Sequence, residues 1–153
     1  MLLKDVLETK SKDVHTISSN AAVDEVVTKL VRFNIGSLLV RDATRGPILG
    51  IITERDILRA LAAHRAPLEQ LRVATCMTCD LIIAQPDDDI TVAMRLMTTH
   101  RVRHLPVVHR DQLHGIVSIG DIVKAHHDEL ERENHLMLDY IQGGASSAVM
   151  PLA

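Results

Sequence analysis

The nonapeptide Gly-Ile-Ile-Thr-Glu-Arg-Asp-Ile-Leu, residues 50–58, returns as Gly-Ile-Val-Ser-Ile-Gly-Asp-Ile-Val at residues 115–123. In both copies a glycine and two β-branched residues precede a hydroxyl residue, and an aspartate follows three positions later. Self-similarity at a fixed offset is the mark of a structure built from repeated units. The chain is therefore predicted to contain two copies of one structural unit.

The repeat continues upstream of the nonapeptide. Residues 14–18 match residues 81–85, and each run ends at turn formers, which predicts two short strands. Second strands are predicted at 37–40 and 104–108, and the nonapeptide supplies the third strand and the start of a helix. Between the first and second strands, apolar residues at helical spacing predict one helix in each copy: Val23, Val26, Val27 and Leu30, and Ile90, Ala93, Met94 and Met97.

Each copy thus reads β-α-β-β-α, with a short leading helix expected at residues 2–7 and 68–73. The expected fold class is α/β (α+β), two such motifs packed about a pseudo-two-fold axis. A half of about 65 residues buries little surface alone, so the two halves are expected to share one core. The expected domains are 1–66 and 67–128, followed by a helical extension at 129–142 and a flexible tail at 143–153.

Composition limits the possible functions. Of 153 residues, 46% are hydrophobic, which suits a folded domain, and the net charge of −3 without a basic stretch argues against a general nucleic-acid binder. One Phe, one Tyr and no Trp leave few rings on which bases could stack. The chain shows no apolar run of membrane-spanning length and no signal-peptide pattern, so no membrane association and a cytoplasmic location are expected.

Cysteine and histidine leave two readings open. Cys76 and Cys79 form a Cys-x-x-Cys pair that suits redox or zinc chemistry, or else two small apolar residues at the end of a short helix. A zinc site of this kind would need a second cysteine pair, which the chain lacks. His126 and His127 are adjacent and point to different helix faces, which favours solvated surface. No metal site is predicted.

The hydroxyl and the aspartate of the nonapeptide also have two readings. Thr53 with Asp56, and Ser118 with Asp121, have the spacing of a helix capping box. The same groups at a helix N-terminus suit an anionic ligand. The repeat does not separate the two readings, because either would recur in both copies.

Taken together, the two copies resemble a tandem pair of cystathionine-β-synthase (CBS) domains, a Bateman module. The run Arg-His-Leu-Pro-Val at 103–107 is similar to the second strand of that family, and Met77-Thr78 to its usual opening. The resemblance covers about residues 1–128. It implies a regulatory module without catalytic residues or catalytic cofactor. Such modules bind an adenosyl effector (AMP, ADP, ATP, NAD or S-adenosylmethionine) in clefts between the copies.

In that family the aspartate holds the ribose, the hydroxyl and its neighbours meet the phosphates, and the adenine lies between aliphatic residues. The resemblance implies one cleft formed by Thr53, Arg55, Asp56, Leu81, Ile82, Val102, Arg103 and His104. It implies a second cleft formed by Ser118, Gly120, Asp121, Val14, His15, Ile35, Gly36 and Ser37. Arg103 could also be a solvated cation, and His15 a strand-face residue without a ligand. Arg55 and Arg103 lead us to expect tighter phosphate binding in the Asp56 cleft.

Function and partners follow from the same resemblance. The expected function is an adenine-nucleotide sensor that acts through an unknown regulated protein in signal transduction, and the expected assembly is a homodimer. One alternative is an interaction protein with vestigial clefts. The other is a nucleotide-using enzyme, for which the chain shows no P-loop, no G-x-G-x-x-G and no Ser-His-Asp order.

Overall fold

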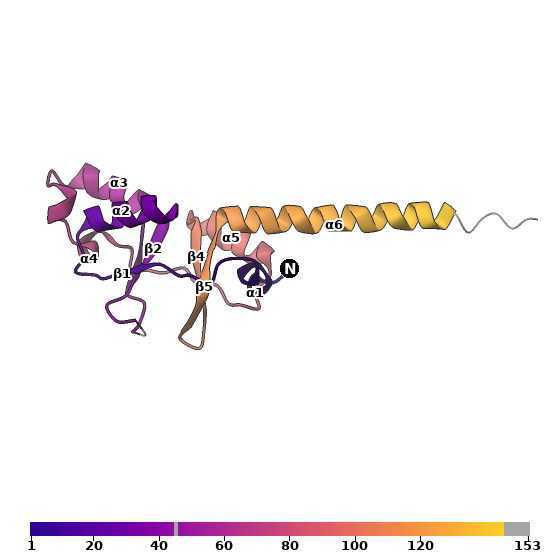
Figure 1. Ribbon diagram of the computed structural model, residues 1–153, viewed down its shortest axis with the longest axis horizontal. Coiled ribbons are helices and arrows are strands. Elements are labelled where there is room, and N and C mark those ends of the chain that lie inside the picture. The colour runs from indigo at the N-terminus through magenta and orange to yellow at the C-terminus, as the bar shows by residue number, and fades with distance from the viewer. Residues whose placement is uncertain (45, 146–153) are drawn as a thin grey trace, which may run out of the picture.

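A computed structural model describes residues 1–44 and 46–145 of the chain (Figure 1). The first repeat contains β1 (Thr16–Ile17), α2 (Val23–Phe33), β2 (Ser37–Val40), β3 (Gly50–Thr53) and α3 (Glu54–Ala63), preceded by α1 (Leu3–Glu8). The second contains α5 (Ile90–His100), β4 (His104–His109), β5 (Gln112–Ser118) and α6 (Ile119–Ala145), preceded by the 3-10 turn η1 (Leu68–Gln70) and α4 (Val73–Cys76). The predicted mixed helix and strand fold is confirmed.

The two halves carry separate small sheets. In the first, β1 pairs parallel to β2, and β3 pairs antiparallel to β2. In the second, β4 and β5 form an antiparallel pair. The strand predicted at residues 81–85 is wrong, because this stretch contributes only an isolated parallel bridge between Ala84 and Val107. Pro86 follows two residues later and has no N–H to extend the ladder.

The helix predicted at residues 68–73 is also wrong. Leu71 and Arg72 are extended, so a 3-10 turn and a four-residue helix replace one helix. The extended backbone has a partner of its own, since the Leu71 carbonyl accepts from the N–H of Val23 at 2.9 Å at the start of α2. Tertiary hydrogen bonds outside the segment thus override its local helical tendency.

The expectation of one shared core is replaced by two clusters of buried side chains, and each draws on both repeats. Leu3 and Val6 of α1 pack with Ile90, Leu105 and Ile122 of the second repeat. Conversely, Leu71 and Val73 pack with the buried residues of the first repeat. Figure 1 shows α1 beside β5 and the first part of α6, on the side of the body away from α2 and α3. The leading segment of each repeat therefore packs against the core of the other repeat.

This exchange explains the glycine that opens each nonapeptide. A Cβ on Gly50 would lie 2.6 Å from the Thr78 carbonyl oxygen, which is closer than a carbon atom can approach. A Cβ on Gly115 would lie 2.8 Å from Cδ2 of Leu7. In both halves, the motif glycine makes room for the leading segment of the other repeat.

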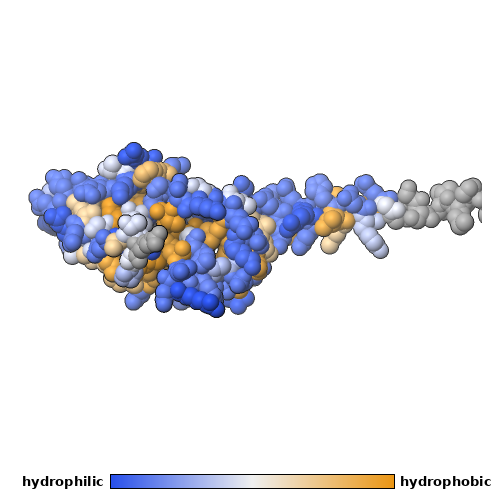
Figure 2. All heavy atoms as spheres, turned by 60° about the horizontal axis from the view of Figure 1, so that its bottom comes forward, coloured by the Kyte–Doolittle hydropathy of each residue, from blue (hydrophilic) through white to orange (hydrophobic). Residues whose placement is uncertain are grey.

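The long helix α6 contains both the end of the second nonapeptide and the extension predicted at 129–142. Its C-terminal part runs beyond the body of the protein (Figure 1), and an orange patch is visible on it in Figure 2. The large hydrophobic or aromatic side chains exposed on this part are Leu136, Met137, Leu138, Tyr140 and Ile141. The expected tail at 143–153 begins inside α6, and its residues 146–153 lie outside the described part of the chain. In that described part, every helix is too short or too polar to span a membrane.

Candidate functional site

A cavity of about 680 Å³ lies between the two halves. It is bordered by the α1–β1 linker, the start of β2, strand β5 and the first turn of α6. Seven of the eight residues predicted for the Asp121 cleft line it: Val14, His15, Ile35, Gly36, Ser37, Ser118 and Asp121. Gly120, the eighth, does not, and its nearest neighbour at the Cβ position is Oγ of Ser118 at 3.7 Å.

Asp121 is held by the strand-to-helix turn and by a lysine. Its Oδ2 accepts hydrogen bonds from Ser118 N at 2.7 Å, Ser118 Oγ at 2.9 Å and Lys10 Nζ at 2.6 Å. The Asp121 N–H donates back to Ser118 Oγ at 3.2 Å, so the capping box is formed. Within residues 1–44 and 46–145, Oδ1 accepts no hydrogen bond. The cap and the ligand reading are therefore compatible here, because the cap uses only one carboxylate oxygen.

The charge of Asp121 is stabilised despite its partial burial. Burial by itself would raise the pKa of this carboxyl, but the hydrogen bonds from Lys10 and Ser118 outweigh it and hold the pKa below its usual value. Asp121 is therefore an ionised acceptor in the cavity wall at neutral pH.

Lysines of the N-terminal segment are the site residues that sequence reasoning missed. Lys4, Lys10 and Lys12 all line the cavity, and Lys10 Nζ also donates to the Ile116 carbonyl at 3.0 Å. These residues lie outside the repeated motifs, and only the exchange of leading segments brings them to the second repeat. The sequence motifs therefore gave no indication of these lysines.

His104 lies in this cavity and not beside Asp56, where the resemblance placed it. The reason is strand register, because His104 pairs directly with Ser118 across β4 and β5. Gly36 faces it so closely that a Cβ would lie 3.0 Å from the imidazole Cε1 and Nε2 atoms. Burial lowers the pKa of the His104 imidazole, so the ring is favoured as neutral.

Asp56 has a different environment from Asp121. It is only 5% exposed, and Oδ2 accepts from Thr53 N at 2.9 Å and Thr53 Oγ1 at 3.1 Å. Its Oδ1 accepts from Thr78 Oγ1 at 2.9 Å, so both oxygens are occupied. Neither Thr53 nor Asp56 lines the hollows of about 680 Å³ and 510 Å³. The capping box is formed here, and the carboxylate is buried among donors of the protein.

The other residues predicted for the Asp56 cleft are only partly brought together. Arg55, Val102 and Arg103 line a smaller hollow of about 510 Å³, with Ile119 at its edge. Leu81 and Ile82 do not line it, and Ile82 packs against the core of the second repeat. Arg55 Nη1 donates to the Arg101 carbonyl at 3.1 Å. The expected convergence of two arginines is present, but the ribose-holding carboxylate is not beside them.

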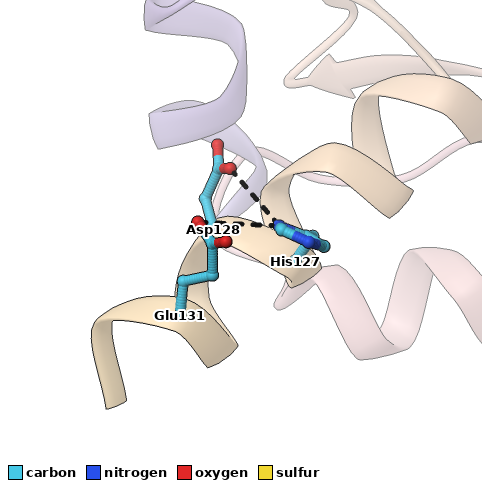
Figure 3. Close-up of side chains that lie close together, drawn as sticks. All are labelled: His127, Asp128 and Glu131. Carbon is cyan, nitrogen blue, oxygen red and sulfur yellow. Dashed lines mark ion pairs between the residues drawn. The ribbon is translucent and has the colours of Figure 1, made fainter. Parts of the chain in front are cut away.

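Two other clusters carry chemistry. Cys76 and Cys79 are free thiols, the first half-buried at the end of α4 and the second exposed. On α6, Nδ1 of His127 lies 4.0 Å from Asp128 Oδ1 and 3.8 Å from Glu131 Oε2 (Figure 3). All three side chains in this group are exposed and outside both hollows, as expected of ion pairs on a solvated helix.

Known proteins resemble this chain over most of its length. A family model described as "CBS domain" matches residues 3–63 and 73–128. The CBS domain-containing protein CBSX3, mitochondrial, of Arabidopsis thaliana is 35% identical over 93% of this chain and 72% of its own length. The CBS domain-containing protein YhcV of Bacillus subtilis is 32% identical over 78% of this chain and 84% of its own length.

Solved structures give the same result. A CBS-domain-containing protein from Agrobacterium tumefaciens has a TM-score of 0.77 at 38% identity, covering 82% of this chain and 92% of its own. The CBS domain pair of protein MJ0100, in complex with 5′-methylthioadenosine and S-adenosyl-L-methionine, has a TM-score of 0.71 at 29% identity, covering 82% and 99%. With two matched repeats, exchanged leading segments and a cavity between the halves, this chain belongs to the CBS-domain family and carries a CBS domain pair.

Proposed function

We propose that this protein is a regulatory module that binds an adenosine phosphate of the AMP, ADP, ATP or NAD type in the cavity beside Asp121. The main support for this proposal is the Asp121 carboxylate. It is ionised, it lines a cavity of about 680 Å³, and its Oδ1 atom is free to accept a hydrogen bond from a ligand. A carboxylate that accepts ribose hydroxyls makes short, charge-assisted hydrogen bonds. The volume is within the range of ligand pockets.

The walls of the cavity suit the remaining parts of such a ligand. Val14 and Ile35 offer aliphatic contacts for an adenine ring, and Lys4, Lys10 and Lys12 offer donors for phosphate. The complex of protein MJ0100 with two adenosyl compounds supports an adenosyl ligand in this family. The proposal reverses the asymmetry expected from sequence, because the hollow lined by Arg55 and Arg103 lacks an open carboxylate.

Calorimetric titration of adenosine, AMP, ADP, ATP, NAD and S-adenosylmethionine tests the proposal. We expect at least one adenosine phosphate to bind the wild type and Asp121→Ala to weaken it tenfold or more, since a lost hydrogen bond to a charged group costs about 1.5–3 kcal/mol. Asp128→Ala, an exposed acid on α6, is the matched control. Failure of every compound to bind dialysed protein would favour an interaction protein with vestigial clefts.

The wider role is proposed on the same basis. The bound nucleotide regulates another protein, the module forms a homodimer, and it works in the cytoplasm without catalytic activity. The plant relative CBSX3 is named as a mitochondrial protein, so cell fractionation in the source organism is the direct test of location. Incubation with ATP or NAD followed by product analysis tests the absence of catalysis.

A further inference from the structure

Lys10 forms an ion pair with the Asp121 carboxylate, which is the group proposed to bind the ribose. Its Nζ lies 2.6 Å from Asp121 Oδ2 and 3.0 Å from the Ile116 carbonyl oxygen, and both side chains of the ion pair are half-buried in the cavity wall. The bond joins residues 111 positions apart, one from each repeat. Ser118 donates twice to the same oxygen, which brings Oδ2 to three donors.

A ribose with two neighbouring hydroxyls is best held when each carboxylate oxygen accepts one of them. Oδ1 is open, whereas Oδ2 is saturated, so one of its three donors must leave. The Ser118 N–H donor belongs to the capping box and is fixed by the turn into α6, and the Ser118 hydroxyl donor is on the short side chain of the same residue. Lys10 is the one on a long, flexible side chain, and it is therefore the donor that a ribose displaces.

A displaced ammonium needs a new partner. Leaving a half-buried cation without one is unfavourable, because its desolvation is no longer offset. Among the neighbouring acids, Asp87 is already paired with Lys4 at 2.8 Å. Of the acids that line the cavity, Glu8 and Asp13 are exposed to water.

We propose that Lys10 determines ligand class at this site by moving from Asp121 to a ligand phosphate when the ribose takes the carboxylate. Adenosine displaces the ammonium without replacing its anion. S-adenosylmethionine has one carboxylate but also a sulfonium and an ammonium, so its net positive charge disfavours a site with a displaced lysine. Of these ligands, the adenosine phosphates supply both the ribose and a net negative counter-charge. This inference rests on the proposed function and names the residue by which the site selects ligands with a phosphate on the ribose 5′ carbon.

Titration of adenosine and AMP into wild type, Lys10→Met and Lys10→Arg tests this. In the wild type we expect AMP to bind at least about tenfold more tightly than adenosine, as charge-assisted pairing with phosphate implies. Lys10→Met keeps the apolar stem but has no ammonium to displace. AMP should therefore lose about tenfold, while adenosine binds as well or more tightly. Lys10→Arg should keep the preference, and Lys124→Met, an exposed lysine on α6, should change neither affinity.

The opposite responses of the two ligands separate selection from a structural role. Equal losses of adenosine and AMP in Lys10→Met, with an unchanged melting temperature, would overturn the inference while the proposed function stands. A wild type that binds adenosine or S-adenosylmethionine as tightly as AMP would overturn it as well. If no adenosyl compound binds the wild type at all, the proposed function itself fails.

Discussion

Lys10 and Asp121 form an ion pair of 2.6 Å across the two repeats, and Thr78 and Asp56 form the corresponding contact of 2.9 Å in the other half. In both cases the donor comes from the leading segment of the opposite repeat. The difference lies in the donor, because Lys10 is a cation beside the large cavity and Thr78 is a neutral hydroxyl on a buried carboxylate. This difference supports the proposal that Asp121 binds the ligand while Asp56 stabilises the fold.

The first prediction separates these two roles. Asp56→Ala should lower the free energy of unfolding by about 1–3 kcal/mol, because Thr53 N and Thr78 Oγ1 lose a buried acceptor, and should leave adenosine phosphate binding intact. Asp121→Ala should cost about 1 kcal/mol as a lost cap and abolish most ligand affinity. Urea denaturation and calorimetry on both variants measure this. Loss of binding in Asp56→Ala without loss of stability would place the ligand in the other cleft.

A second prediction concerns two glycines of the nonapeptides. Gly50→Ala should destabilise the protein by about 1–3 kcal/mol, because the new Cβ would meet the Thr78 carbonyl at 2.6 Å and disrupt its hydrogen bond with the N–H of Ile51. Gly120→Ala should be neutral or stabilise by up to about 1 kcal/mol, since its nearest neighbour is 3.7 Å away and alanine favours a helix. Thermal unfolding of both variants tests this prediction. Equal changes in stability for Gly50→Ala and Gly120→Ala would contradict the close packing at Gly50.

The third prediction is that the stability of the protein depends on pH through the protonation of His104. Its pKa is lowered in the folded protein by burial, so below its ordinary value near pH 6.5 the unfolded chain binds the proton more readily than the native state. Stability should therefore fall as the pH is lowered from 7 toward 5.5, with a contribution from this residue of at most about 1.4 kcal/mol per pH unit.

Replacement of His104 by glutamine should remove that part of the slope. Urea denaturation at several pH values, compared between wild type and His104→Gln, gives the difference directly. His100→Gln, on the exposed end of α5, serves as the control. Parallel stability curves for wild type and His104→Gln would show that His104 does not contribute.

A fourth prediction concerns the homodimer. The last residue of each nonapeptide, Leu58 on α3 and Val123 on α6, is 66% and 59% exposed, which predicts a contact surface made by corresponding positions of the two repeats. Light scattering at micromolar concentration should give twice the chain mass of 16.9 kDa for wild type. Leu58→Glu with Val123→Glu should give monomers, because a charge in an apolar interface is costly to bury.

Tyr140→Glu probes the projecting end of α6 in the same experiment. If this variant dissociates the dimer and the double variant does not, the contact lies on the projecting helix. We expect Tyr140→Glu to remain dimeric. A monomeric wild type would contradict a dimer contact at either surface.

Much of the architecture could be read from local sequence. The helices at Val23–Phe33 and Ile90–His100 follow from apolar residues at helical spacing, and both capping boxes follow from a hydroxyl and an aspartate three positions apart. These features depend on atoms within a few residues of one another, so their geometry is set wherever the backbone turns from strand to helix.

The failures have a common cause. Residues 68–73 depart from the predicted helix because the Leu71 carbonyl accepts a hydrogen bond from the distant N–H of Val23. Residues 81–85 pair with a distant strand only at Ala84, opposite Val107, and Pro86 cannot extend that pairing. His104 lies beside Asp121 because of the register with Ser118 across two strands. Local propensity is weak compared with such tertiary hydrogen bonds.

The sequence by itself determined that there are two units, which elements each contains and which aspartates stand at the helix starts. Only the tertiary structure decided which aspartate faces the large cavity with an open oxygen, because that depends on the exchange of leading segments between the halves. Lys10 reaches Asp121 across 111 residues of chain, whereas Thr78 reaches Asp56 across 22. A hydrogen bond between distant residues is fixed by the packing of whole elements, and no local spacing encodes it.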